Sequence, residues 1–288
     1  AIDRSDDTSP FRGGAVGYWA YDFGRRLERL PERAPDLALP DFVLGLYDVI
    51  GAFDHATGRA WAFSTGLPRA GAERDERAAR RLERFAALWS GAVAPRAVSA
   101  ALRVTSPRST FDADAYRRAV ERVREHIRRG DIFQANLSQR FLLRCEGGDP
   151  AAIARALFER LCARSAAPYG AFFDAGDHWI ASASPERFLE LAGRVVETRP
   201  IKGTRPRGAD PASDARLAAE LLASAKDRAE NVMIVDVLRN DLGRVCEAGS
   251  VAVPELCALE GFPHVHHLVS TVTGRLAAGR DAFDLLHA

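Results

Sequence analysis

The stretch Phe188-Leu189-Glu190-Leu191-Ala192-Gly193-Arg194-Val195-Val196-Glu197 decides how this chain folds. Both of its halves are rich in apolar and β-branched residues, which favour strands, and Gly193 separates them as a turn residue. The same arrangement occurs upstream, where Ala171–Phe173 and Trp179–Ala181 flank the turn pair Gly176-Asp177. We therefore predict two successive antiparallel strand pairs over residues 170–199.

The surrounding sequence adds helices to these strands. Residues 112–129 begin at an aspartate, place apolar side chains at helical spacing and stop before Gly130. Helical spacing returns over residues 214–240, whereas residues 131–145 and 250–276 have the pattern of strands. Strands and helices without a strict βαβ alternation indicate an α+β fold with antiparallel sheets.

The N-terminal third has its own organisation. Residues 11–66 have the pattern of strands with short turns, and residues 71–90 have the pattern of a helix. The segment Ser90–Pro107 lacks the spacing of a helix or a strand. It contains a proline at position 95 and ends on another, which is typical of a linker. We expect an N-terminal region over residues 1–100 and a second domain over residues 108–288.

Composition narrows the classes of function. The 288 residues are 47% hydrophobic and 27% charged, with a formal net charge of +1, which is ordinary for a globular enzyme. So small a net charge argues against nucleic acid or an anionic membrane as the main partner. The sequence contains no apolar run of membrane-spanning length and no signal-peptide pattern, so we expect a cytoplasmic location. The four cysteines are widely separated, which is unlike a zinc site.

One segment concentrates reactive groups: Pro200-Ile201-Lys202-Gly203-Thr204-Arg205-Pro206-Arg207-Gly208. Its prolines and glycines predict a shaped loop. Arg205 and Arg207 suit bidentate binding of carboxylates, and their positive field favours a neutral, nucleophilic amine on Lys202. Judged by composition alone, a solvated basic turn is the more common outcome for such a segment.

Two glutamates are candidates for chemistry. Glu186 follows a proline at the turn between two predicted strands, where it can act as a general acid or form an exposed pair with Arg187. Glu230 precedes an apolar helical run and stands four residues after Lys226. This spacing fits a surface salt bridge, and partial burial would equally fit an oxygen ligand for magnesium.

The histidines His264, His266 and His267 lie close together in a predicted strand. Neighbouring strand residues point to opposite faces, so His266 and His267 cannot both face the same site. No cysteine or carboxylate stands at zinc-ligand spacing nearby, and we expect a single histidine that hydrogen-bonds a substrate.

Five motifs follow one another along the sequence: Gly130–Phe141, Ser184–Phe188, the 200–208 segment, Ala229–Val245 and His267–Val272. In this order they resemble those of the chorismate-utilising enzymes, which include anthranilate synthase component I, aminodeoxychorismate synthase component I, isochorismate synthases and salicylate synthases. The motifs extend through nearly the whole of residues 111–276. Residues 11–66 resemble the preceding N-terminal region of the two amine-forming types. The resemblance implies that family's sandwich of two antiparallel sheets flanked by helices, truncated at both ends.

The resemblance also implies a reaction. In the aminodeoxychorismate type, the lysine of this segment is the nucleophile that attacks the chorismate ring, and anthranilate synthases usually carry alanine there. Lys202 therefore implies amination of chorismate to 4-amino-4-deoxychorismate in folate biosynthesis, with Glu186 as the acid that protonates the departing hydroxyl. The ammonia would come from a separate glutamine amidotransferase subunit.

The remaining family positions carry over to this sequence residue by residue. Glu230 matches a ligand of Mg²⁺, and Gly203, Thr204 and His267 match substrate-binding positions. Pro168, Tyr169 and Gly170 fall where the family contacts a bound tryptophan.

Two alternatives to this reaction remain. The first is anthranilate synthase component I of tryptophan biosynthesis, which shares nearly every motif except the lysine. The second is a catalytically incomplete fragment that only binds a ligand or partner. A glycine-rich segment that the family carries further on, with a second magnesium ligand, is absent from these 288 residues, so we expect the chain to be inactive alone.

Overall fold

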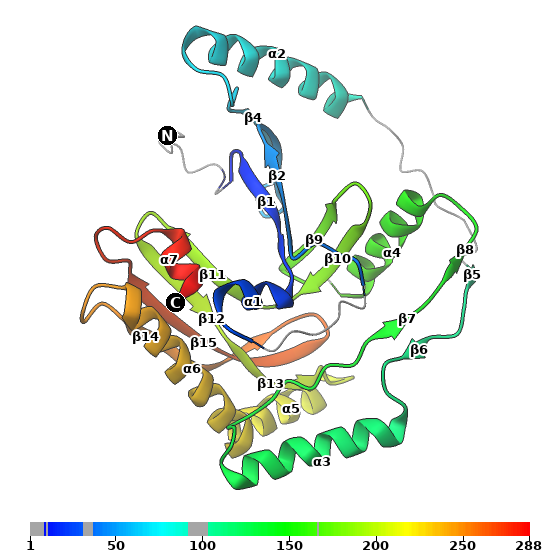
Figure 1. Ribbon diagram of the computed structural model, residues 1–288, viewed down its shortest axis with the longest axis vertical. Coiled ribbons are helices and arrows are strands. Elements are labelled where there is room, and N and C mark those ends of the chain that lie inside the picture. Colours follow the sequence, from blue (N-terminus) through cyan, green and yellow to red (C-terminus); the bar gives the residue numbers. More distant parts are fainter. Residues whose placement is uncertain (1–8, 10, 31–36, 92–102, 166) are drawn as a thin grey trace. The chain divides into compact units, whose positions relative to one another are not determined.

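The computed structural model describes every residue except 1–8, 10, 31–36, 92–102 and 166 (Figure 1). By packing, the chain divides into two compact units, one formed by Ala1–Pro95 with Phe158–Ala288 and the other by Arg96–Leu157. Much of the predicted linker Ser90–Pro107 lies outside the described residues. The boundary between residues 100 and 108 therefore stays a prediction.

The unit Arg96–Leu157 is built around one long helix, α3 (Ala113–Arg129). Asp112 caps this helix by accepting a hydrogen bond from the amide of Ala115 at 2.6 Å, and Gly130 ends it in the left-handed conformation. The helix prediction is confirmed. The unit also contains two short antiparallel strand pairs and the start of a second helix: β5 (Arg103–Val104) with β8 (Cys145–Glu146), β6 (Arg108–Ser109) with β7 (Phe141–Leu142), and α4 (Pro150–Arg164).

The prediction of a continuous strand over residues 131–145 was wrong. Only the pairs at 141–142 and 145–146 are strands, and residues 131–140 run without a strand beside them in the described part of this unit. A segment with alternating apolar and polar residues forms a strand only where a neighbouring strand supplies hydrogen bonds. The spacing of residues in the sequence does not show whether such a neighbour is present.

The N-terminal part of the larger unit consists of two antiparallel strand pairs and a helix, as the pattern over residues 11–90 predicted. Their bounds are β1 (Gly14–Trp19), a 3₁₀ turn (Tyr21–Phe23), α1 (Gly24–Leu27), β2 (Phe42–Tyr47), β3 (Val49–Asp54), β4 (Arg59–Ser64) and α2 (Gly71–Ser90). The strand β1 pairs with β2, and β3 pairs with β4.

A five-stranded antiparallel sheet forms the centre of the C-terminal part. Its strands are β11 (Arg187–Ala192), β12 (Val195–Arg199), β13 (Ile201–Pro206), β14 (Ala252–Gly261) and β15 (Val265–Arg275). The strands β12 and β13 follow one another along the same edge of β15, and β14 pairs with its opposite edge. A separate pair, β9 (Tyr169–Asp174) with β10 (Trp179–Ser184), precedes the sheet and confirms the predicted turn at residues 176–177.

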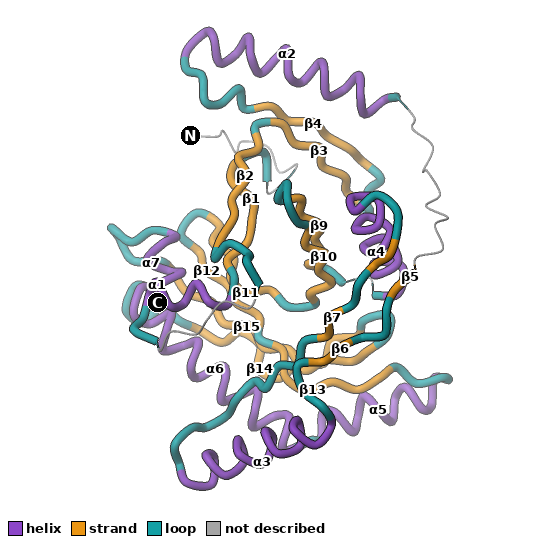
Figure 2. Tube along the Cα trace, turned by 45° about the vertical axis from the view of Figure 1, so that its right-hand side comes forward, coloured by secondary structure: helices purple, strands orange, loops and turns teal. Residues whose placement is uncertain are grey.

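Two helices cover one face of this sheet. They are α5 (Pro211–Ala223) and α6 (Ala225–Val245), which break at Ser224 instead of forming the single helix that residues 214–240 suggested. Figures 1 and 2 show both helices beside β13 and β15. The final helix, α7 (Ala282–His287), packs on the same core. That core consists of buried side chains from the sheet and these helices: Val196, Val235, Leu242, Val245, Cys246, Val272, Leu276 and Leu285.

The segment 200–208 is a strand over most of its length, which corrects the prediction of a loop. Its residues pair with β15, from Ile201 opposite Val269 to Pro206 opposite Val265. The register shifts between Ile201 and Thr204, so the segment keeps a local irregularity inside the strand. Long-range pairing thus overrides the breaking tendency of proline and glycine, which a bulge and a strand end tolerate.

Candidate active site

Glu186 and the start of β13 are held together by a hydrogen bond. Glu186 lies between the end of β10 and the start of β11, and its side chain is exposed. The amide of Ile201 donates to Oε1 of Glu186 at 2.9 Å. The carboxylate is therefore fixed beside the residue that precedes Lys202. The alternative pairing with Arg187 is not what holds it, because Arg187 contacts Glu190 and Glu197.

The bulge at Lys202 depends on Gly203. Gly203 has a φ of +85°, which disfavours other residues, and a Cβ placed there would lie 2.8 Å from Cβ of Asp227 and 3.0 Å from Cδ1 of Leu221. Lys202 is half-buried on the strand beside it. The close contact of helix and strand is therefore possible only with glycine at this position.

Thr204 and His267 face one another across β13 and β15. They are cross-strand partners, and Oγ1 of Thr204 lies 2.9 Å from Nδ1 of His267. Burial lowers the pKa of His267, while a hydrogen bond to the Gly203 backbone and the charges of Glu186 and Glu260 act in the opposite direction. The imidazole is therefore neutral at pH 7 and can exchange hydrogen bonds with a ligand.

His266 points to the other face of β15, as strand geometry predicted. Its Nε2 lies 2.9 Å from Oδ1 of Asp214, and hydrogen bonds from Arg207 and Gly208 hold the pKa of that carboxyl far below its usual range. The sequence left the choice among the three histidines open, and the resemblance selected the one that lies with Thr204.

The two arginines of the segment do not form the expected clamp for a ligand's carboxylates. Arg205 bridges Glu220 and Asp227 on the helices, and Arg207 makes a bidentate contact with Asp214. Both guanidinium groups are thus neutralised by carboxylates of the chain itself. Residue type predicted the chemistry of these contacts correctly but could not identify their partners.

Glu230 lies on α6 in the surface pair that its spacing predicted. Its Oε1 is 2.9 Å from Nζ of Lys226, and about 40% of its side chain is exposed. Within the residues that the structure describes, no group of three or more histidine, cysteine, aspartate or glutamate side chains could enclose a metal ion. An accessible single carboxylate still suits Mg²⁺, which keeps several waters and takes few protein ligands.

Pro168 and Tyr169 line a pocket of about 120 Å³ beside the central sheet. The guanidinium of Arg187 lies 5.5 Å from the ring centre of Tyr169, and Arg199 with Glu260 forms an ion pair on the same wall. Gly170 pairs with Ala183 in the β9–β10 ladder. The ion pair was missed by the sequence reasoning, although the position of Glu260 opposite His267 follows from strand pairing.

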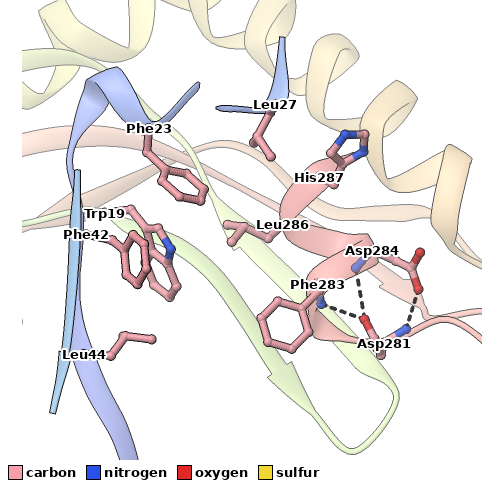
Figure 3. Close-up of a pocket in the computed structure, with 10 residues that line it drawn as sticks. All are labelled: Trp19, Phe23, Leu27, Phe42, Leu44, Asp281, Phe283, Asp284, Leu286 and His287. Carbon is pink, nitrogen blue, oxygen red and sulfur yellow. Dashed lines mark hydrogen bonds between the residues drawn. The ribbon is translucent and has the colours of Figure 1, made fainter. Parts of the chain in front are cut away.

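A larger pocket lies elsewhere, between the N-terminal strands and α7 (Figure 3). It measures about 590 Å³ and is lined mainly by apolar and aromatic side chains, including Trp19, Phe42 and Phe283. Its two carboxylates, Asp281 and Asp284, form the capping box at the start of α7 (Figure 3). None of the predicted site residues lines it, so size does not identify the candidate site here.

Among the described residues, no helix has both the length and the apolar composition needed to span a bilayer.

The candidate site lies on an antiparallel sheet backed by helices. A carboxylate, a lysine, a hydroxyl and a neutral imidazole lie on or beside one bulged strand of this sheet. This arrangement has the parts of an acid–base and nucleophile site.

Comparison with known proteins gives the family. A family model described as chorismate binding enzyme matches residues 2–288, and the chain belongs to this family. It is 44% identical over 97% of its length to aminodeoxychorismate synthase component 1 of Klebsiella aerogenes, and 42% identical over 99% to anthranilate synthase component 1 of Thermus thermophilus. The chain spans 58% and 60% of these two relatives.

The fold prediction is confirmed by a solved structure. Anthranilate synthase component I of Streptococcus pneumoniae superposes with a TM-score of 0.80 over 99% of this chain and 62% of its own, at 30% identity. Relatives with both names match at similar identity, so identity alone does not favour either name.

Proposed function

We propose that this chain forms part of an enzyme that aminates chorismate at ring C4 to give 4-amino-4-deoxychorismate, which supplies p-aminobenzoate for folate. One observation carries the proposal: Lys202 stands on the bulge of β13, directly after the residue whose amide holds the carboxylate of Glu186 at 2.9 Å. Anthranilate synthases usually carry alanine at this position. Lys202 therefore favours amination at C4 over the formation of anthranilate.

The proposed chemistry divides one difficult displacement into two easier ones. The amine of Lys202 forms a bond to a ring carbon while the C4 hydroxyl leaves as water, taking its proton from Glu186. Ammonia then forms a bond at C4 as the bond to the lysine breaks, and the surplus proton returns to Glu186. The sum is chorismate plus ammonia giving 4-amino-4-deoxychorismate plus water, with Lys202 regenerated.

Composition supports a special role for this lysine. Only Lys202 and Lys226 are lysines among the 40 basic residues of the chain. Arginine stays protonated at any physiological pH and cannot act as a nucleophile, whereas a lysine can lose its proton. A chain that uses arginine at nearly all its cationic positions thus keeps a lysine on the bulge of β13.

The binding residues are proposed from the family resemblance. Gly203, Thr204 and His267 would contact the substrate, and the carboxylate of Glu230 would hold Mg²⁺, which neutralises the carboxylates of chorismate when bound. A glutamine amidotransferase subunit would supply ammonia, consistent with relatives named as component 1. We place the enzyme in the cytoplasm, and assign the pocket at Pro168 and Tyr169, with the adjoining Gly170, to bound tryptophan.

The experiment that tests this function is a product assay. Because these 288 residues are expected to be inactive alone, a full-length version that carries them is incubated with chorismate, Mg²⁺ and an ammonium salt, and products are separated by chromatography. We expect 4-amino-4-deoxychorismate. Fluorescent anthranilate instead would show the alternative reaction, and the absence of both, with calorimetry still detecting chorismate binding, would show a binding module.

A further inference from the structure

The guanidinium of Arg205 joins three elements around the bulge of β13. Its Nε donates to Oε1 of Glu220 at 2.9 Å, and Nη2 lies 3.2 Å from Oδ2 of Asp227. Its Nη1 donates to the backbone carbonyl of Thr204 at 2.9 Å. Glu220 belongs to the last turn of α5 and Asp227 to the first turn of α6, so one side chain connects both helix ends to the strand.

These contacts are sheltered enough to hold geometry. About 25% of the Arg205 side chain and 12% of the Asp227 side chain are exposed. A planar guanidinium that uses all three of its nitrogens has one orientation available, and partial burial reduces the screening of its charge. Arg205 is therefore fixed in place, in contrast to the many exposed arginines of α3.

The backbone between these contacts and Glu186 is where the register shifts. Ile201 and Thr204 are the regular partners of Val269 and His267, and Lys202 and Gly203 lie between them outside the regular pairing. The bulge is held at its start by the bond from Ile201 to Glu186 and at its end by the bond from Arg205 to Thr204. Asp227 packs against Gly203 from the helix side.

We propose that Arg205 is a positioning residue, which anchors the Lys202–Gly203–Thr204 bulge to the junction of α5 and α6 so that the lysine amine stays in a productive place. Arg205 binds carboxylates of the chain itself, and its role is to restrict the motion of β13. The effect of Arg205 on catalysis rests on the proposed function, whereas its effect on the motion of the strand does not.

The first test measures the strand without substrate. Backbone hydrogen–deuterium exchange is compared for the native chain, Arg205→Met, Arg205→Lys and Arg207→Met, the last being a matched control on the same side of the sheet. In Arg205→Met we expect exchange in peptides covering residues 201–204 to rise by about tenfold or more, with β14 unchanged. Arg205→Lys should restore part of the protection, and Arg207→Met should leave this segment as it is.

The second test measures catalysis in the amination assay. Arg205→Met should lower kcat by about ten- to a hundredfold while changing KM for chorismate by much less, because misplacing a nucleophile costs rate rather than binding.

In the exchange test, unchanged hydrogen–deuterium exchange over residues 201–204, or an equal rise throughout the sheet, would overturn the positioning role. Failure of the native protein to aminate chorismate would remove the proposed function and leave the exchange result standing.

Discussion

Ser270 on β15 donates its hydroxyl to Oδ1 of Asn231 on α6 at 2.5 Å, and both side chains are fully buried. Asn231 in turn donates from Nδ2 to the carbonyl of Leu268 at 3.1 Å, and Ser270 accepts from the amide of Cys257 at 2.9 Å. This network joins α6 to both β14 and β15. It therefore fixes the rotation of the helix that carries Glu230 against the strand that carries His267.

Asn231→Leu should destabilise the fold by about 2–4 kcal/mol, because a side chain of similar size leaves the hydroxyl of Ser270 and the carbonyl of Leu268 buried without their partner. Guanidinium chloride unfolding measures this change. Asp236→Asn, on the exposed side of the same helix, is the control and should change stability by less than about 0.5 kcal/mol. A cost for Asn231→Leu as small as that of the control would contradict the importance of the network.

Gly203→Ala should destabilise the chain and disturb the bulge. The new methyl group would meet Cβ of Asp227 at 2.8 Å, and the φ of +85° is strained for alanine, so we expect a loss of about 1–3 kcal/mol. Gly243→Ala is the matched control. Gly243 lies inside α6 with nothing within 4 Å of a new Cβ, so alanine should stabilise by about 0.5–1 kcal/mol. Thermal unfolding of both variants distinguishes local strain from a general effect of the substitution.

The contrast between helix α3 and strand β13 shows which features local sequence determines. Asp112, the apolar stripe and Gly130 lie within one segment, and they predicted the helix and its ends correctly. The pairing of Thr204 with His267 joins residues 63 positions apart, and no local pattern contains that information. The same holds for Arg205, whose residue type indicated carboxylate binding while its partners Glu220 and Asp227 were set by the packing of α5 and α6. Composition favoured a solvated turn, and only the order of several motifs indicated a site.

The buried neutral state of His267 makes stability depend on pH. Because burial lowers the pKa of His267 below the reference value of 6.5, the unfolded chain binds more protons than the folded chain as the pH falls through 6.5. Stability from this residue is therefore complete above about pH 6.5 and declines below it, until the folded pKa is passed. Denaturant unfolding between pH 5 and 8 should show this decline, and His267→Gln should flatten it. His55→Gln, at an exposed position, should leave the decline unchanged; a similar flattening there would contradict the assignment.

The pair of Lys226 and Glu230 predicts how magnesium binding responds to mutation. The ammonium of Lys226 lies 2.9 Å from the carboxylate proposed to hold Mg²⁺, so the two cations compete for the same oxygen atoms. Lys226→Met should tighten Mg²⁺ binding by about two- to fivefold, the modest effect expected for an exposed pair, and Glu230→Gln should weaken it. Calorimetric titration with Mg²⁺ measures both. Arg239→Met, which removes the comparable pair with Asp236 on the same helix, should have no effect. Equal affinities in all variants would exclude Glu230 as the ligand.

The decisive prediction concerns Lys202. Replacement by alanine should reduce 4-amination by about a thousandfold or more, because the nucleophile is lost while the rest of the site is kept. Lys202→Arg should be equally inactive, because arginine keeps the positive charge but cannot attack carbon. Substantial activity in Lys202→Arg would show that the lysine acts through its charge alone. The composition of the chain sharpens a direct test by mass spectrometry of the full-length protein quenched during turnover, because these 288 residues contain only two lysines to distinguish. A substrate-derived mass on the peptide containing Lys202, and none on the peptide containing Lys226, is the expected result. If Lys202→Ala still aminates chorismate at the native rate, the carboxylate of Glu186 must act without a covalent partner, and the position of Lys202 on the bulge needs another explanation.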